Sequence, residues 1–362
     1  MRKLATIRTI DSLDPIDGAD KIEVATVGGW KVVAQKGLYN VGDLAVYFEI
    51  DSWIPTSVAP FLTKAGHYPK SFEGVEGERL KTIKLRGQIS QGLLMPVHND
   101  KTGTYLMIYT DETGEYSLTV AEGDDVTEVL GIKKWEKAIP ANLAGTCKGN
   151  FPSKIPKTDQ ERCQNLKKEI TQANEADTAF EITEKCEGSS MTVYRMKVDD
   201  EMEFGVCSRN LNLKETEGNS FWDRARKDDI EAKMKAVDEF WDFAIQGELV
   251  GPGIQDNIYG LTETEFRVFD VYNIQTGEYL MPQARRDLIA RMGLKHAPVI
   301  EESATLHGTL NITDIPQLLD YADGKSVIGF TGHLREGVVF KEVNGGFTFK
   351  AISNKYLCNQ RD

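Results

Sequence analysis

The sequence has 362 residues, 40% of them hydrophobic and 27% charged, which is the composition of a globular chain long enough for two or three domains. No apolar run approaches the roughly 18 residues that a membrane span needs, and no secretory leader begins the chain, so we expect a cytoplasmic protein with no membrane association. The net charge of -13 argues against a large non-specific footprint on nucleic acid, and five cysteines without a C-x-x-C pair argue against disulfides or structural zinc.

Residues 1–130 are predicted to be rich in β-structure. Short runs of β-branched and aromatic residues are interrupted by turn signals such as Gly28-Gly29, a pattern typical of a small barrel or sandwich. The predicted strands are Ile22–Val27, Lys31–Ala34, Asp43–Ile50, Lys81–Leu85, Gly92–Val97 and Tyr105–Tyr109.

Residues 131–174 are polar and basic, with nine lysines and arginines against four acidic residues. We predict a connecting segment that enters a helix over Asp159–Ala173. Its basic character either provides a local phosphate-contacting face or is incidental to a linker.

Residues 175–362 mix helices and strands, which predicts an α+β domain with antiparallel strands. Ile230, Met234, Val237 and Trp241 recur at the spacing of one helix face. The other predicted elements are helices over Asp287–Met292 and Ile315–Tyr321, and strands over Ala179–Thr183, Met191–Met196, Phe266–Val271, Gly337–Phe340 and Phe347–Ile352.

Five short segments carry residues suited to nucleotide chemistry. Taken singly, each segment is more often an ordinary structural element than a functional site. Lysine and glutamate at strand ends are usually solvated, and phenylalanine in a strand usually lies in the core. The order of the whole set is much more specific. In chain order the segments are Phe180–Gly188 with Lys185, Gln246–Gln255 with Glu248, Phe266–Val271 with Phe269, Glu336–Lys341 with Glu336, and Phe347–Lys355 with Lys350.

This ordered set resembles the motifs of the covalent nucleotidyltransferases, the polynucleotide ligases and RNA capping enzymes. Residues 175–357 resemble the adenylyltransferase domain of ATP-dependent RNA ligases, above all those that seal nicks in double-stranded RNA. The resemblance is carried by Gly247–Gln255 followed by Phe266–Asp270, and by Val206–Asn210, which is similar to a segment with a substrate-contacting arginine.

The first part of the chain resembles the barrel that one branch of RNA ligases carries at the N-terminus. Gly18–Val24 and Leu85–Leu93 are also similar to tRNA-binding OB domains. The resemblance therefore implies an OB-like, RNA-binding β-barrel over residues 1–130, the connecting segment, and an adenylyltransferase domain over residues 175–362 built on antiparallel sheet.

The resemblance implies an ATP-dependent RNA ligase that joins a 3′-hydroxyl to a 5′-phosphate in RNA repair. The reaction passes through a covalent lysyl-AMP and an RNA-adenylate. The implied cofactors are ATP and Mg²⁺ or Mn²⁺, and the implied partners are RNA ends, in particular nicked duplex RNA. We expect a monomer.

The resemblance also implies roles for individual residues. The catalytic residues are Lys185 as the nucleophile, Lys350 at the α-phosphate and Glu336 at the metal. The nucleotide-binding residues are Glu184 beside the adenine, Arg209 at a phosphate or the ribose, Glu248 at the ribose hydroxyl, Phe269 stacked on the adenine, and Lys350.

The nucleophile must lose its proton before it can attack. A free lysine has a pKa of about 10.4. We therefore expect neighbouring cations and partial desolvation to lower the pKa of Lys185, with help from a metal ion.

Three positions depart from the family's pattern. Glu187 stands where the first motif commonly has aspartate, and Ser190 stands where the nick-sealing group often has asparagine. In the last motif, Lys350 is followed by Ile352 instead of a second lysine. Lys355 is an alternative, although a strand would place it on the opposite face from Lys350.

The sequence ends soon after Lys350, and we expect it to lack the further domain that many ligases carry there. The N-terminal barrel is then expected to contact RNA or the leaving pyrophosphate, with Lys81, Lys84 and Arg86 as candidates. The alternative is that these residues form an ordinary solvated strand face.

Three other functions were weighed: an RNA capping guanylyltransferase, a DNA ligase, and a non-catalytic RNA-binding protein with a degenerate nucleotidyltransferase domain. The first two are disfavoured by the RNA-ligase character of the segments and by the lack of a trailing domain. The third is disfavoured because Lys185, Glu248, Glu336 and Lys350 are all present.

Overall fold

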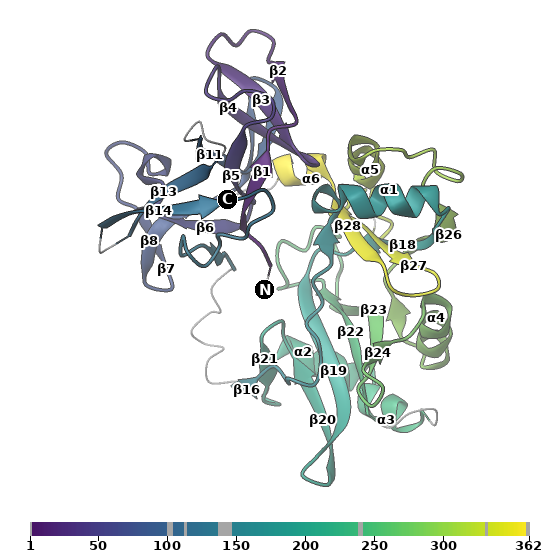
Figure 1. Ribbon diagram of the computed structural model, residues 1–362. Coiled ribbons are helices and arrows are strands. Elements are labelled where there is room, and N and C mark those ends of the chain that lie inside the picture. The colour runs from purple at the N-terminus through teal and green to yellow at the C-terminus, as the bar shows by residue number, and fades with distance from the viewer. Residues whose placement is uncertain are drawn as a thin grey trace. The chain divides into compact units, whose positions relative to one another are not determined.

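The computed structural model describes residues 2–99, 104–111, 114–136, 147–237, 242–329 and 332–359. The chain divides into two compact units, Met1–Ala138 and Ile139–Asp362, each with its own apolar core (Figure 1). Within the described ranges, no helix is long and apolar enough to cross a membrane.

The first unit consists of short antiparallel strands. All five residues of β5 (Leu44–Phe48) are buried, and β1 (Ala5–Thr9) and β11 (Leu93–Pro96) pair with its two edges. The other elements of this unit are β2 (Ser12–Pro15), β3 (Ile22–Val27), β4 (Trp30–Gln35), β6 (Ser52–Pro55), the 3-10 helix η1 (Pro60–Leu62), β7 (Lys70–Phe72), β8 (Val75–Arg79), β9 (Thr82–Leu85), β10 (Gln88–Gln91), β12 (His98–Asn99), β13 (Tyr105–Asp111), β14 (Gly114–Val120) and β15 (Lys133–Lys134).

The six strands predicted for residues 1–130 are all present, as β3, β4, β5, β9, β11 and β13. The strands form the sheets β1-β5-β11, β2-β3-β4, β12-β13-β14, β15-β6-β8-β7 and β10-β9. Ile7, Val46 and Phe48 lie in the apolar core between them. These short antiparallel sheets confirm the β-rich domain predicted for residues 1–130.

The second unit contains two sheets. The larger has the order β16-β21-β20-β19-β22-β23-β24, with β25 parallel to β23, and the smaller has the order β17-β28-β27-β18-β26. The strands are β16 (Cys147–Asn150), β17 (Glu161–Arg162), β18 (Ala179–Lys185), β19 (Ser189–Val198), β20 (Glu201–Cys207), β21 (Leu211–Leu213), β22 (Phe243–Val250), β23 (Glu265–Asn273), β24 (Glu278–Tyr279), β25 (Lys295–His296), β26 (Val299–Thr305), β27 (Gly337–Glu342) and β28 (Thr348–Ile352).

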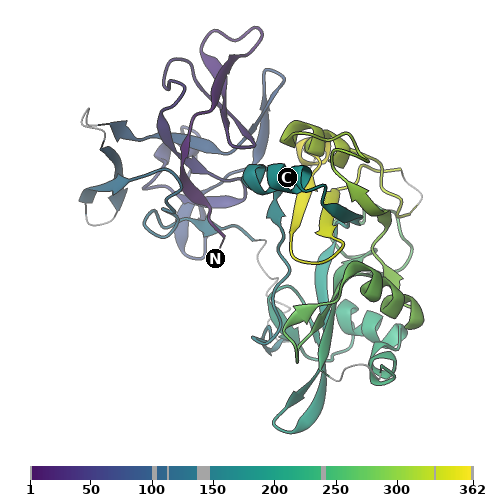
Figure 2. The same ribbon diagram turned by 45° about the vertical axis from the view of Figure 1, so that its right-hand side comes forward.

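Helices cover a face of each sheet (Figure 1, Figure 2). Three of them, α2 (Ser220–Lys227), α3 (Ile230–Lys235) and α4 (Pro282–Arg291), bury apolar side chains against the larger sheet. Two others, α1 (Lys167–Glu175) and α5 (Ile315–Ala322), pack on the smaller sheet. The remaining helical elements are the 3-10 helix η3 (Cys163–Asn165) and the C-terminal α6 (Asn354–Asn359).

Two predicted helices overlap α4 and α5. Of the predicted apolar helix face, Ile230 and Met234 lie buried in α3, and Val237 is buried just beyond its end. Trp241 lies outside the described residues.

The structure differs from the prediction over residues 131–174. Lys133–Lys134 pairs with β6 in the first unit, whereas β16 pairs with β21 in the second. The helix predicted over Asp159–Ala173 begins only at Lys167, because Glu161 and Arg162 are held extended by parallel pairing with β28. Most of the described part of this segment is therefore built into the two units.

A buried network of charges joins the two sheets of the second unit. Glu181 on β18 accepts hydrogen bonds from the guanidinium groups of Arg285 and Arg286 on α4. Lys341 on β27 donates to the Asp270 carboxylate on β23 at 2.6 Å. Removing one partner of such a buried pair costs about 3–5 kcal/mol, because the other charge is left unpaired.

The same network keeps His296 neutral. Arg285 Nε donates to His296 Nε2 at 3.0 Å, so that ring nitrogen must carry a lone pair. Burial lowers the pKa of His296 to about 4, and the Arg285 cation adds to the effect.

We expect protonation of His296 to contribute to acid destabilisation. The unfolded chain takes up the proton near pH 6.5, roughly the ordinary histidine pKa, while the folded protein resists until about pH 4, so this stability is full above pH 6.5 and falls below it. A His296→Gln variant should lose less stability than the parent between about pH 7 and about pH 5.5. Thermal midpoints of both proteins at the two pH values test this, and equal losses would contradict it.

Candidate active site

Lys185 and Glu336 meet at one end of the smaller sheet. Lys185 is the last residue of β18, and Glu336 immediately precedes β27. These strands are antiparallel neighbours with Lys185 opposite Gly337. Lys185 Nζ donates a hydrogen bond to Glu336 Oε2 at 2.7 Å, so strand pairing joins two motifs that are 151 residues apart in the sequence.

The glycines of these two motifs lie where strands approach too closely for a side chain. A Cβ on Gly337 would lie 2.2 Å from the Ala351 carbonyl oxygen, and one on Gly188 would lie 2.3 Å from the Leu249 carbonyl oxygen. Both distances are far inside van der Waals contact. The two glycines therefore let β28 approach β27, and let the segment after β18 approach β22, which carries Glu248.

Lys185 is held as a cation in this site. Burial alone lowers its pKa, but the carboxylates of Glu336 and Glu248 outweigh burial and leave the pKa of Lys185 raised. The expectation of a lowered pKa is wrong for the site as it stands. The reason is that the fold places carboxylates, not cations, against the amine.

Two further carboxylates share this region. Burial raises the pKa of Glu248 to about 8, against the lowering effects of the Lys185 and Arg209 cations, and repulsion from Glu336 and Glu187 adds to the rise. Burial also raises the pKa of Glu187 to about 7, and the Glu336 carboxylate adds to it. Three acidic groups thus compete for one lysine, which makes the site attractive to a further cation.

The chemistry of these donors suits a divalent metal. Carboxylate oxygens are the ligands that Mg²⁺ and Mn²⁺ prefer. Among the described residues, no three acidic, histidine or cysteine side chains already converge closely enough to hold an ion. Glu336, the predicted metal ligand, is engaged by Lys185. The set fits an ion that shares its coordination with phosphate oxygens and water, as Mg²⁺ commonly does.

Phe269 is the bulged residue of β23. Gln246 lies opposite Asp270 and Gly247 lies opposite Val268, so Phe269 is the extra residue between them. Its half-buried ring packs on an apolar cluster, which provides a flat surface of the kind that a nucleobase stacks on. The buried members of this cluster are Cys186, Val250, Tyr259, Ala297 and Ile328.

Glu184 secures a loop beside this apolar cluster. Its carboxylate accepts hydrogen bonds from the Ser326 hydroxyl at 2.5 Å and from the Val327 backbone N–H at 3.1 Å. Burial raises the pKa of Glu184, although both hydrogen bonds oppose the rise. The side chain therefore anchors the loop that supplies Ile328 to the cluster.

Asp159 brings the predicted residues Lys350 and Arg209 together. Lys350 Nζ donates to Asp159 Oδ1 at 2.9 Å, and Arg209 Nη2 lies 3.8 Å from Asp159 Oδ2. The Lys350 side chain is almost buried, whereas Arg209 is 44% exposed. Arg209 also contributes to the field at Glu248, which places it at the same site.

Lys355 does not join Lys350. The strand β28 ends at Ile352, and Lys355 lies in α6, with its Nζ 3.4 Å from Asp323 Oδ2. The structure therefore does not support Lys355 as a replacement for the family's second lysine.

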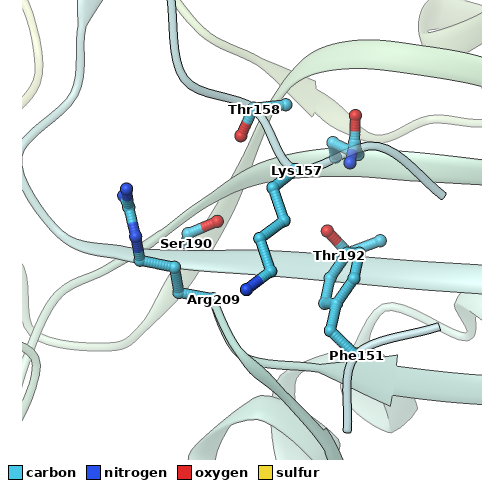
Figure 3. Close-up of a pocket in the computed structure, with 7 residues that line it drawn as sticks. Phe151, Lys157, Thr158, Ser190, Thr192 and Arg209 are labelled. Carbon is cyan, nitrogen blue, oxygen red and sulfur yellow. The ribbon is translucent and has the colours of Figure 1, made fainter. Parts of the chain in front are cut away.

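A small polar pocket adjoins Arg209 (Figure 3). Lys157 and Arg209 extend into it over the part of β19 that carries Ser190 and Thr192. Lys157 Nζ donates to Asn210 Oδ1 at 2.6 Å. The remaining lining residues are Phe151, Thr158 and Gln246.

Two residues of the site were not predicted from the sequence. Tyr259 is fully buried, and its hydroxyl accepts a hydrogen bond from the Glu187 backbone N–H at 2.6 Å. Asp159 lay inside the predicted helix. One signal was available for it, because Asp159 is the only carboxylate between Lys148 and Gln160 in an otherwise basic stretch.

We expect Glu336→Gln to make Lys185 lose its proton at lower pH, because the substitution removes the nearest carboxylate that stabilises the ammonium. The rate of Lys185 modification by an amine-selective reagent, followed by peptide mass spectrometry across pH in nucleotide-free protein, measures this. Glu302→Gln, at an exposed position, is the control. An unchanged pH profile for Glu336→Gln would contradict the electrostatic account.

Two family models match the sequence. An OB-fold domain model matches residues 4–97, and an RNA ligase model matches residues 178–352. A comparison with curated proteins found no match.

Solved structures of Naegleria gruberi RNA ligase are similar over almost the whole chain. A lysine-to-alanine mutant with ATP and Mn is 40% identical, with a TM-score of 0.82 and 98% of each chain covered. A mutant with AMP and Mn is 41% identical, with a TM-score of 0.82 and the same coverage. The enzyme with pyrophosphate is 41% identical, with a TM-score of 0.81, covering 99% of this chain and 98% of that one.

Proposed function

This chain belongs to the RNA ligase family, and we propose that it joins RNA 3′-hydroxyl and 5′-phosphate ends with ATP, through a lysyl-AMP formed on Lys185. The observation that carries the proposal is the arrangement of Lys185 against Glu336, next to the apolar cluster with Phe269. The Naegleria gruberi enzyme, solved with ATP, AMP and pyrophosphate, supports the choice of nucleotide.

In the first step the Lys185 amine attacks the α-phosphorus of ATP. A P–N bond forms, the bond to the pyrophosphate oxygen breaks, and the amine gives up a proton. Because Glu336 and Glu248 stabilise the ammonium, the ion pair has to open before attack. A divalent ion held by Glu336 would supply positive charge to the phosphoryl oxygens. Lys350, in the middle of β28, contacts the α-phosphate.

The nucleoside is held by groups on both sheets. Phe269 stacks on the adenine, and the main chain at Glu184 borders the base. Glu248 accepts a hydrogen bond from a ribose hydroxyl, and Arg209 holds a phosphate or the ribose.

The later steps transfer the nucleotide and then expel it. A 5′-phosphate oxygen of RNA attacks the lysyl-AMP phosphorus, the P–N bond breaks, and a 5′–5′ RNA-adenylate forms. The RNA 3′-hydroxyl then attacks the 5′-phosphate, a phosphodiester forms, and AMP leaves. Nicked duplex RNA is the proposed substrate, and RNA repair by a cytoplasmic monomer is the proposed setting.

The first unit is proposed to contact RNA through the hairpin of β9 and β10. Lys81, Lys84 and Arg86 are exposed along its first strand and tip. Exposed cations on an OB-type domain are suited to nucleic-acid phosphates.

We expect the purified protein, after treatment with pyrophosphate to remove resident AMP, to retain label from α-labelled ATP on a denaturing gel. Label from α-labelled GTP should be absent, and Lys185→Ala should abolish labelling because no amine remains to form the P–N bond. Lys197→Ala, at an exposed lysine of the same unit, should label normally. Label from GTP would indicate capping chemistry, and no label from either would overturn the ligase proposal.

We expect combined substitution of Lys81, Lys84 and Arg86 by alanine to raise the KM for nicked duplex RNA on the order of tenfold, with a shallower salt dependence, because phosphate contacts are lost. Lysyl-AMP formation should be unchanged. The matched control replaces the exposed Lys31, Lys36 and Lys64 of the same unit by alanine. An equal rise in the KM for RNA in both triple variants would assign the effect to the overall charge of the unit rather than to the hairpin.

A further inference from the structure

Asp159 lies between Lys350 and Arg209, the two cations that the proposed function assigns to phosphate binding. One carboxylate oxygen accepts the hydrogen bond from Lys350 Nζ at 2.9 Å, and the other lies 3.8 Å from Arg209 Nη2. Two anionic oxygens facing a lysine and an arginine are the arrangement that a phosphate group adopts at such a pair. The carboxylate therefore resembles the ligand that these cations are expected to bind.

The segment that carries Asp159 is anchored to the larger sheet. Ile155 is buried in an apolar cluster with Tyr194, and Phe151 packs against the same cluster. Gln246 Nε2 on β22 donates to the Pro156 carbonyl oxygen at 2.8 Å.

Beyond Asp159 the chain is fixed to the smaller sheet, because β17 pairs with β28, the strand that carries Lys350. Both flanks of Asp159 are thus held, and its position between the sheets is set by the fold. A surface side chain that met Lys350 by chance would not have these supports.

The charge of Lys350 explains why an anion is built in. Lys350 is only 8% exposed, and a buried ammonium without a counter-ion is costly. Asp159 supplies that counter-ion when no nucleotide is bound. Arg209 is more exposed and depends on the carboxylate less.

We propose that Asp159 is a built-in competitor for this phosphate subsite, and that it sets the affinity for nucleotide phosphate. The inference rests on the proposed function, in which Lys350 and Arg209 contact the nucleotide. When a phosphate binds, it takes over Lys350 and Arg209, and the Asp159 carboxylate moves to solvent. When the phosphate leaves, Asp159 returns and keeps Lys350 paired, which favours release of AMP.

The test is calorimetric binding of ATP, AMP and adenosine to the full-length chain without divalent metal. Lys185→Met is present throughout to prevent the covalent step. In this background Asp159→Asn should lower the Kd for ATP and for AMP about fivefold, the scale of one partly exposed ion pair. The Kd for adenosine, which has no phosphate, should not change.

Asp200→Asn is the matched control. It removes the same charge from an exposed turn of the same unit, where Asp200 pairs with Lys197, and asparagine suits its positive φ of 69°. This variant should leave all three affinities unchanged. A Kd for ATP and AMP that is unchanged or higher in Asp159→Asn would overturn the proposal, as would an equal gain for adenosine.

A second variant and a second measurement distinguish competition with phosphate from a purely structural role for Asp159. Asp159→Ser should also tighten ATP and AMP. Both variants should melt at lower temperature than the parent without ligand, and inorganic phosphate should raise their melting temperature more than that of the parent. A lower melting temperature without ligand, combined with a phosphate-induced rise no larger than that of the parent, would overturn the proposal. Absence of lysyl-AMP in the unmodified chain would instead contradict the proposed function.

Discussion

The buried charges between the two sheets of the second unit are the constraint on which the active site depends. Lys341 pairs with Asp270, which directly follows the bulged Phe269, and Lys341 Nζ also donates to the Phe269 carbonyl oxygen at 2.7 Å. Lys341 lies opposite Glu181 in the β18–β27 pairing. The network therefore includes residues of β18, the strand that ends at Lys185. Breaking it would leave charges without partners in a low-dielectric interior. The relative position of Phe269 and Lys185 is therefore fixed by electrostatics as well as by packing.

The site pairs each of its two lysines with a carboxylate. Lys185 faces Glu336, and Lys350 faces Asp159. These pairings keep each ammonium stable in a partly desolvated setting. The raised pKa of Lys185 follows from its pairing with Glu336 and from the nearby Glu248 carboxylate, which together outweigh burial.

Sequence patterns were informative where one physical requirement dominates. Alternation and β-branched runs identified the strands, because half-buried strands need apolar side chains at every second position. Gly188 and Gly337 marked the site motifs in the sequence because neighbouring backbones leave no room for a side chain at either position. The helix predicted from Asp159 failed at its start, because polar residues without clear periodicity are compatible with helix or extended chain. Pairing with β28, a contact distant in sequence, decided between the two.

The sequence by itself determined which reactive groups the protein contains. They form an ordered set of lysine, glutamate and phenylalanine segments in an α+β domain that follows a small β-domain in the sequence. Tertiary structure alone decided what surrounds each group. It placed Glu336 rather than a cation beside Lys185, and it brought Asp159 to Lys350 from 191 residues away. The physical reason is that a side chain's type is local, whereas its protonation and partners depend on charges and burial that only strand pairing across the whole chain creates.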